Sequence, residues 1–538
     1  MSSDGGWAGG YAALAGNCKM MAAPCAEENS VPGSGSTRTP SPSSGRSTPR
    51  SQRSVSKCRT IRNYGEVRTS ELWKWLWVDF SLPPRSPVSR LIKRNMRNHS
   101  REHLLDLEGG EEAMETIREE QCVGFSPWGE TPLGEGSIGA AVFTLVSSAM
   151  GAGCLSLPFM LSEAGLIPGI IMLVVGALLA HLSLVVLMSC ARYTDSDSMA
   201  RLVSLTDGGN GRIVDFAIAV YGIAAALCYL MFIGDFFVGI AHSPLLNLEV
   251  SRETVIIGIS LVVVWPLSLP RNLSALRHVC VLSVLAICLT ALAVAWKAPS
   301  YAALAAKAGS GAEENSELWA IKWWNSDPST MLKSFSIALF AFAAHTNAVP
   351  VATSLKKADG GSIWRVSFYS VCIELVFYVV MGLAGYLSFR GTTKQDFILN
   401  YQNDDMLMFL VRCIYGMVVC LGAPINLSPA ASSILGLIRG RGRSGHCVRK
   451  QHFVVVTTII AACLGVALWN EKVADVIGLC GASFGSLIVL AWPAMIYRQA
   501  LFDLHPRRLA RFVYIALMCA AAFGVASFVV QAANFLRR

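Results

Sequence analysis

Charged side chains are scarce in this chain: Asp, Glu, Lys and Arg make up 15% of its 538 residues, while apolar residues make up 53%. A soluble protein averages about 25% charged residues, because charges must cover its outside. The shortage excludes a cytosolic enzyme, a secreted disulfide scaffold and a nucleic-acid-binding domain. It predicts a membrane protein whose outer surface is largely covered by the hydrocarbon of a lipid bilayer.

The sequence also lacks metal-binding and redox motifs. None of its 16 cysteines lies in a C-x-x-C motif or at Cys/His metal spacing. Ten of them fall in or at the end of apolar runs, where a thiol behaves as a small hydrophobe. We therefore expect no metal, no cofactor and no catalytic site, hence no enzyme. The chain does not open with a short apolar segment and a cleavage site, so we expect no cleaved signal peptide.

The first 130 residues contain no long apolar run and are rich in Ser, Pro and Arg. Residues 1–100 contain 15 Lys and Arg against 6 Asp and Glu, whereas the other 438 residues contain 30 of each. Such a segment cannot bury enough apolar surface to offset its ordering entropy, so residues 1–130 are predicted to be a disordered, basic cytoplasmic tail. Thr39-Pro40, Ser41-Pro42 and Thr48-Pro49 suggest kinase sites, although ordinary low-complexity sequence explains them equally well.

Apolar runs begin near residue 138 and continue almost to the end of the chain. A bilayer core about 30 Å thick needs roughly 20 apolar residues for each helix. By this measure the fold class is an all-α polytopic membrane protein with about 11 transmembrane helices in residues 136–534. The expected helices cover residues 138–161, 166–190, 212–241, 253–270, 276–296, 331–354, 366–389, 406–430, 452–470, 473–497 and 511–534.

Basic residues are distributed unequally between the loops of the two sides. If the N-terminus is cytoplasmic, the cytoplasmic loops contain 17 Lys and Arg and the opposite side contains ten. The positive-inside rule then places the N-terminus in the cytoplasm and the C-terminus outside or in a lumen. Without an address signal, the plasma membrane is favoured over a vacuolar or lysosomal membrane.

Two of the expected helices are interrupted near the middle of the membrane. The first contains Gly151 and Gly153 and then Pro158, and the sixth contains the polar triplet His345-Thr-Asn and then Pro350. Lipid cannot satisfy the peptide groups that a break frees, so such breaks persist where they line a cavity. Breaks at corresponding positions of two halves indicate an inverted-repeat transporter. The repeats would be about 138–296 and 331–497, with an extra helix at about 511–534.

Peptide groups at two such breaks suit a zwitterionic amino acid. The N-terminal end of a half-helix offers N–H groups and a positive dipole to a carboxylate, and freed carbonyls accept from an ammonium group. We expect the carboxylate on the N–H groups of Gly151–Cys154 and the substrate side chain near Tyr229. The candidate substrate-binding residues are Ser148, Met150, Gly151, Ala152, Gly153, Cys154, Tyr229, Ala341, Phe342, His345 and Thr346.

Ionisable residues inside the membrane are candidates for ion coupling, because each is costly unless it faces the bundle interior. Asp235 and Glu374 are such acids, and desolvation would let Asp235 carry a proton. The alternative for Asp235 is an ion pair with Arg412 or a place near the interface. For His345, a proton relay competes with a plain hydrogen bond or a substrate contact.

Several motifs together resemble a known family. Gly136-Ser-Ile-Gly, Met150-Gly-Ala-Gly-Cys-Leu-Ser-Leu-Pro-Phe and Gly165-Leu-Ile-Pro-Gly resemble the opening of the amino acid/auxin permease family. Phe340-Ala-Phe-Ala-Ala-His-Thr-Asn-Ala-Val-Pro and Ile477-Gly-Leu-Cys-Gly-Ala-Ser-Phe-Gly strengthen the resemblance, which covers roughly residues 136–534. The family implies eleven spans, a fold like that of the broken-helix sodium symporters, and secondary active transport of amino acids.

Two positions depart from the sodium-coupled members of that family, which commonly have Asn where this chain has Ser147 and Thr where it has Gly422. Both changes remove oxygen ligands that Na⁺ would use. The resemblance therefore favours proton coupling or facilitated transport, with Na⁺ symport as an alternative. A rival of another class is a non-transporting amino-acid sensor that signals through the N-terminal tail.

Overall fold

The structure is a computed structural model, which describes residues 136–538 except for 208–210, 271–276, 312–318, 357–359, 440–445, 470–471, 503–504 and 537–538. The N-terminal tail and its expected kinase sites therefore lie outside the described residues. Every regular element within the described ranges is a helix, so the prediction of an all-α protein is confirmed.

Nine helices of the described part of the chain are long and apolar enough to cross a membrane. They coincide with nine of the expected spans. The chain is thus a multi-pass membrane protein. These nine are α7 (Leu166–Thr194), α9 (Gly211–Ala241), α12 (Arg277–Gly311), α13 with α14 (Pro328–Ala341, His345–Ser354), α15 (Gly360–Phe389), α16 (Met406–Arg439), α17 (His446–Trp469), α18 to α19 (Val473–Cys480, Trp492–Ala500) and α20 (Arg507–Leu536).

The other two expected spans also form helices, but broken or short ones. The first divides into α4 (Ile138–Ala149), α5 (Ala152–Leu155) and α6 (Leu157–Ala164). The fourth consists of α10 (Arg252–Ile259), the π-helical turn η1 (Ser260–Val264) and α11 (Trp265–Ser268). Several boundaries differ from the predicted ones. For example, α12 continues to Gly311 rather than 296, because a helix continues past the apolar run into the polar region.

Both expected breaks are present. The helix that begins at Ile138 stops at Ala149 and resumes at Ala152, so Met150 and Gly151 interrupt it. The sixth expected span stops at Ala341 and resumes at His345. The prediction that these two helices lose their regular winding is confirmed.

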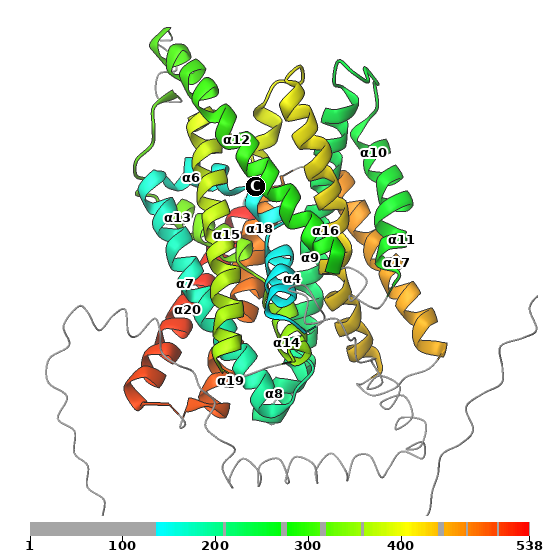
Figure 1. The fold of residues 1–538 in the computed structure, drawn as a ribbon, viewed down its shortest axis with the longest axis vertical. Helices are drawn as coiled ribbons and strands as arrows, with labels where there is room; N and C mark the ends of the chain where they lie inside the picture. The colour runs from blue at the N-terminus through cyan, green and yellow to red at the C-terminus, as the bar shows by residue number, and fades with distance from the viewer. Residues whose placement is uncertain are drawn as a thin grey trace, which may run out of the picture. The chain divides into compact units, whose positions relative to one another are not determined.

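The helices divide into two groups around these breaks (Figure 1). In the first group, α15 packs against α4, α6 and α7, α13 packs against α6 and α7, and α14 packs against α4 and α7. In the second group, α9 and α16 form the most extensive helix pair, and α10 and α17 pack against α9. We call the end of the bundle that carries loops 242–251 and 390–405 the upper face, as it is at the top of Figure 1.

The turn between α6 and α7 requires a glycine. Gly165 has φ +90° and ψ 159°, a conformation that side chains strongly disfavour. A Cβ there would lie 2.8 Å from Trp324 Cα. The same tight approach lets the N–H groups of Leu166 and Ile167, at the start of α7, donate to Lys322 O at 2.9 Å and Trp323 O at 3.2 Å.

Gly165→Ala should therefore destabilise the fold, by about 1–3 kcal/mol from backbone strain alone. Gly258→Ala is the matched control, since a Cβ at Gly258 meets nothing within 4 Å. Alanine also favours a helix over glycine by about 0.5–1 kcal/mol. Thermal unfolding of the full chain in detergent should show a lower melting temperature for G165A and an equal or higher one for G258A. An unchanged melting temperature for G165A would contradict this account of the turn.

Candidate functional site

The two breaks are in direct contact. A Cβ added to Gly153 in α5 would lie 2.9 Å from Ala341 Cα, the last residue of α13. Only a glycine allows the two backbones to approach this closely. The Gly-x-Gly motif therefore brings the peptide groups of the first break next to those of the second.

Tyrosine hydroxyls donate to carbonyls at both breaks. Tyr378 Oη of α15 donates to Ala341 O at 2.6 Å, and Tyr415 Oη of α16 donates to Gly151 O at 3.0 Å. Cys154 Sγ also donates to Gly151 O, at 3.1 Å, and lies 2.6 Å from Tyr415 Oη. The sequence reasoning missed Tyr378 and Tyr415. Their only signal was a buried phenol in an apolar helix, where a hydroxyl needs a partner.

Tyr229 of α9 is wedged against the first break. A Cβ at Gly151 would lie 1.7 Å from Tyr229 Oη, and a Cβ at Gly422 of α16 would lie 2.6 Å from its ring. Asn426 Nδ2 lies 3.3 Å from the same hydroxyl. Gly422 thus makes room for the Tyr229 ring.

The remaining candidate binding residues lie around this centre. Ser148 Oγ accepts from Asn347 Nδ2 at 2.6 Å, which ties α4 to α14. The ring of Phe342 packs edge-on against that of Tyr378, with centroids 4.9 Å apart. Met150 is buried and Thr346 is half-buried. Helix α5 begins at Ala152, whose side chain is not among the described parts of the structure.

His345 begins α14 and is fully buried, and its Nε2 lies 2.6 Å from Ser183 Oγ of α7. The sequence left a proton relay, a plain hydrogen bond or a substrate contact open for His345, and the structure shows a hydrogen bond. Its Nδ1 has no hydrogen-bond partner among the described residues.

Asp235 forms an ion pair, but its partner is Arg252 rather than Arg412. Arg252 Nε lies 2.9 Å from Asp235 Oδ1, and Arg252 Nη1 donates to Ala467 O at 3.0 Å. The pair thus joins α9, α10 and α17. Of the alternatives for Asp235, the structure shows an ion pair but not the one with Arg412, whose Nη groups donate to Ile398 O, Tyr401 O and Asn403 Oδ1.

Glu374 of α15 is fully buried, and neither of its carboxyl oxygens has a hydrogen-bond partner among the described residues. It lies one helical turn before Tyr378. A buried carboxylate without a partner is costly, and the neutral acid avoids that cost. An ionised Glu374 would therefore lack, among the described residues, the hydrogen-bond partners that offset its burial.

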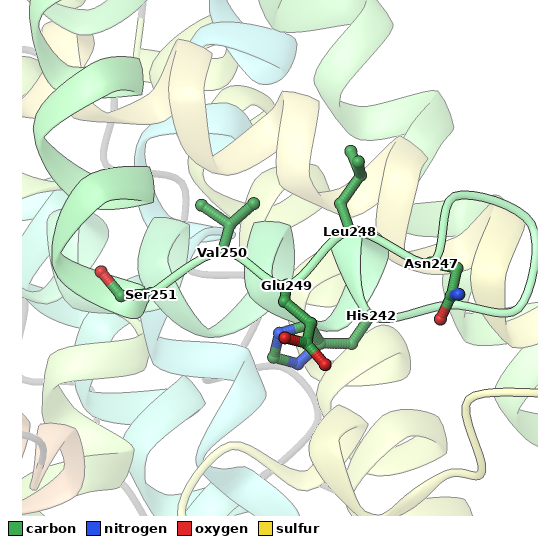
Figure 2. A pocket seen from close by; sticks show the side chains of 6 residues that line it. All are labelled: His242, Asn247, Leu248, Glu249, Val250 and Ser251. Atoms are coloured by element: carbon green, nitrogen blue, oxygen red, sulfur yellow. The ribbon is translucent and has the colours of Figure 1, made fainter.

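One depression on the described part of the chain lies away from the breaks. It has a volume of about 550 Å³ and is formed by loop 242–251 between α9 and α10 (Figure 2). Its lining includes His242, Asn247 and Glu249, and it opens broadly to the outside. None of the expected site residues lines it. Within the described ranges no three His, Cys, Asp or Glu side chains gather as for a metal ion.

Two broken helices that meet inside a bundle of membrane-spanning helices define the broken-helix class of membrane transporters. The fold is shared with a solved manganese transporter of Eremococcus coleocola, with a TM-score of 0.50 at 13% identity over 74% of this chain and 87% of that one. A mutant of the same transporter gives a TM-score of 0.51 at 12% identity, over 77% and 90% of the two chains. At such identities the likeness shows the fold alone.

Residues 134–536 match the family described as transmembrane amino acid transporter protein, and the chain belongs to that family. It is 30% identical to "Putative amino acid transporter AAT1" of Toxoplasma gondii over 60% of this chain and 44% of that protein. It is 27% identical to "Vacuolar amino acid transporter 7" of Saccharomyces cerevisiae over 55% of this chain and 58% of that protein. The chain thus spans about half the length of these relatives.

The bond from Tyr378 to Ala341 O gives a prediction. Tyr378→Phe should destabilise the protein by about 1–3 kcal/mol, because a buried carbonyl loses its donor. Tyr369→Phe is the control, since Tyr369 lies on the same helix and is 49% exposed. The melting temperature in detergent should fall for Y378F and stay unchanged for Y369F. Equal melting temperatures of Y378F and Y369F would show that the Tyr378 hydroxyl does not stabilise the second break.

Proposed function

We propose that the protein is a secondary active transporter that moves amino acids across a membrane by alternating access. The observation that carries this proposal is the contact between the two breaks, where Ala341 O and Gly151 O accept hydrogen bonds from side-chain hydroxyls. Broken helices of a bundle hold charged solutes with these same groups. Family membership supports an amino acid as that solute.

The geometry suggests how the substrate binds. Its ammonium group would take Gly151 O and Ala341 O, replacing the hydroxyls of Tyr415 and Tyr378. Its carboxylate would take the N–H groups of Gly151–Cys154. The side chain would then lie near Tyr229 and Phe342, whose rings border the breaks.

Alternating access would follow from the two groups of helices. Tyr378 and Ala341 belong to one group, so the bond between them can survive a movement of the groups against each other. Tyr229 and Tyr415 belong to the other group and contact Gly151 across the boundary. A substrate that replaces the Tyr415 bond would loosen this boundary and let the group of α4 to α7 and α13 to α15 rock.

We further propose that the coupling ion is a proton, or that transport is facilitative. Glu374 supports a proton because its carboxyl group is buried without a partner, whereas Asp235 is paired with Arg252. Ser147 and Gly422 stand where sodium-coupled members of the expected family supply ligands, which disfavours Na⁺. The plasma membrane is proposed, with a vacuolar membrane as the alternative because the yeast relative is named as vacuolar.

Gly151→Leu should reduce uptake by more than about tenfold. A tenfold loss of substrate affinity corresponds to roughly 1.4 kcal/mol of binding free energy. Uptake should fall because the Cβ of the new side chain alone would lie 1.7 Å from Tyr229 Oη. Gly465→Leu is the control, because a Cβ at Gly465 in α17 meets nothing within 4 Å. Uptake of labelled amino acids into proteoliposomes is the measurement, with pH and Na⁺ gradients imposed separately. Elution of each variant in detergent separates lost folding from lost transport.

Retained uptake by folded G151L would refute the placement of the site. Uptake driven by a Na⁺ gradient and not by a pH gradient would refute proton coupling. A chain that shows no flux, either at full length or without residues 1–120, would favour the sensor over the transporter.

A further inference from the structure

Loop 390–405 joins α15 to α16 on the upper face (Figure 1) and bonds to the chain just beyond the first break. Gln395 O accepts from Ser156 Oγ at 3.1 Å, two residues beyond Cys154. Gln395 Oε1 accepts from the N–H of Ala474 at the start of α18, at 3.0 Å. One residue of the loop thus bonds both to the broken helix and to a helix of the second repeat.

Arg412 of α16 holds the other end of the loop. Its guanidinium is buried and donates to Tyr401 O at 2.7 Å and to Asn403 Oδ1 at 2.7 Å. The loop therefore rests on the bundle through hydrogen bonds at both ends. Any movement that opens the upper face above the first break must release Gln395.

Asp396 is the one acidic side chain that this docked segment buries completely, at 3% exposure, among the described residues of the loop. Its Oδ1 accepts from the N–H of Ile398 at 3.2 Å. Its Oδ2 is buried and has no hydrogen-bond partner among the described residues. An ionised carboxylate with a bare buried oxygen is costly, whereas a protonated one is tolerated.

Charged and titratable groups face Asp396 from each element around it. Asp235 of α9 is a like charge, Arg412 of α16 and Lys394 of the loop are opposite charges, and Cys154 of α5 is a neutral thiol near it. Neither Arg412 nor Lys394 forms an ion pair with Asp396. The charge of Asp396 is therefore not neutralised by direct contact.

Burial raises the pKa of Asp396 well above its usual value, and the charge of Asp235 raises it further. The Ile398 N–H and Arg412 act in the opposite direction but are weaker. Asp405, at the far end of the same loop, behaves differently. Burial raises its pKa, but the bond to Lys297 at 2.6 Å and the Met408 N–H outweigh burial and keep the pKa below its usual value.

We propose that Asp396 is a proton-binding site and that the proton bound there holds loop 390–405 docked over the first break. The loop binds the proton as it docks and releases it as it leaves, because the undocked carboxylate is hydrated. Asp396 is thus a positioning residue that makes closure of the upper face depend on the pH of that side. This inference rests on the proposed transport function and adds a second proton-binding group to Glu374.

The direction of the pH effect follows from the two pKa values. The undocked carboxyl group has an ordinary pKa of about 3.9, and the docked one has a raised pKa. The docked form is therefore most stable below about pH 4 and loses stability as pH rises from there through the raised pKa. In that window the open fraction should increase by up to about tenfold for each pH unit.

Hydrogen exchange of peptides covering 393–401 tests the proposal, with the full chain in lipid nanodiscs at several pH values from 5 to 8. Protection, corrected for intrinsic exchange rates, should fall as pH rises in the wild type. Asp396→Asn carries an uncharged side chain that still accepts from Ile398 N–H, so its protection should be independent of pH. Asp405→Asn is the matched control and should keep the wild-type dependence.

Wild-type protection that is flat over this range would overturn the proposal. So would a wild-type slope in D396N, because a purely structural cap would behave in that way. Loss of protection at every pH in D396N would also overturn it, since the amide stands for the protonated acid. The exchange measurement does not depend on transport. The proposal for Asp396 can therefore fail while the transport proposal holds, and the transport proposal can fail while the one for Asp396 holds.

Discussion

Peptide groups in the middle of a membrane need partners, because lipid offers none. This requirement governs the centre of the protein. Gly151 O and Ala341 O lie at the two interruptions, and hydroxyls of Tyr415 and Tyr378 from two other helices donate to them. These bonds give a carbonyl of each break a partner, and in the proposed mechanism an ammonium group replaces the two hydroxyls.

Glycines and tyrosines together form this centre. Gly153 lets the two breaks touch, and Gly151 and Gly422 leave the space that the Tyr229 ring fills. Three acidic side chains differ in whether they have a partner. Asp235 is matched by Arg252 and ties helices together, whereas Glu374 and Asp396 each have a buried oxygen without a partner. Unmatched acids are suited to binding protons, and these two lie on different elements, Glu374 in α15 and Asp396 in loop 390–405.

The sequence predicted the parts of this architecture that depend on local composition. Apolar runs located the spans, and Gly151 with Gly153, and His345-Thr-Asn with Pro350, located the breaks. The sequence did not predict contacts between distant segments. Nothing near Tyr378 or Tyr415 indicates that their partners are carbonyls of other helices, and Asp396 lies in a loop without any motif. Asp235 was given the wrong alternative partner because its true one, Arg252, comes close only when the chain turns back after α9.

A density map of the purified protein with the amino acid that it takes up fastest tests the central claim most directly. We expect density for one amino acid between the breaks, with its ammonium group within hydrogen-bond distance of Gly151 O and Ala341 O. The hydroxyls of Tyr415 and Tyr378 should have moved from those carbonyls. Density elsewhere, such as in the depression of loop 242–251, with both tyrosine bonds intact, would contradict the account.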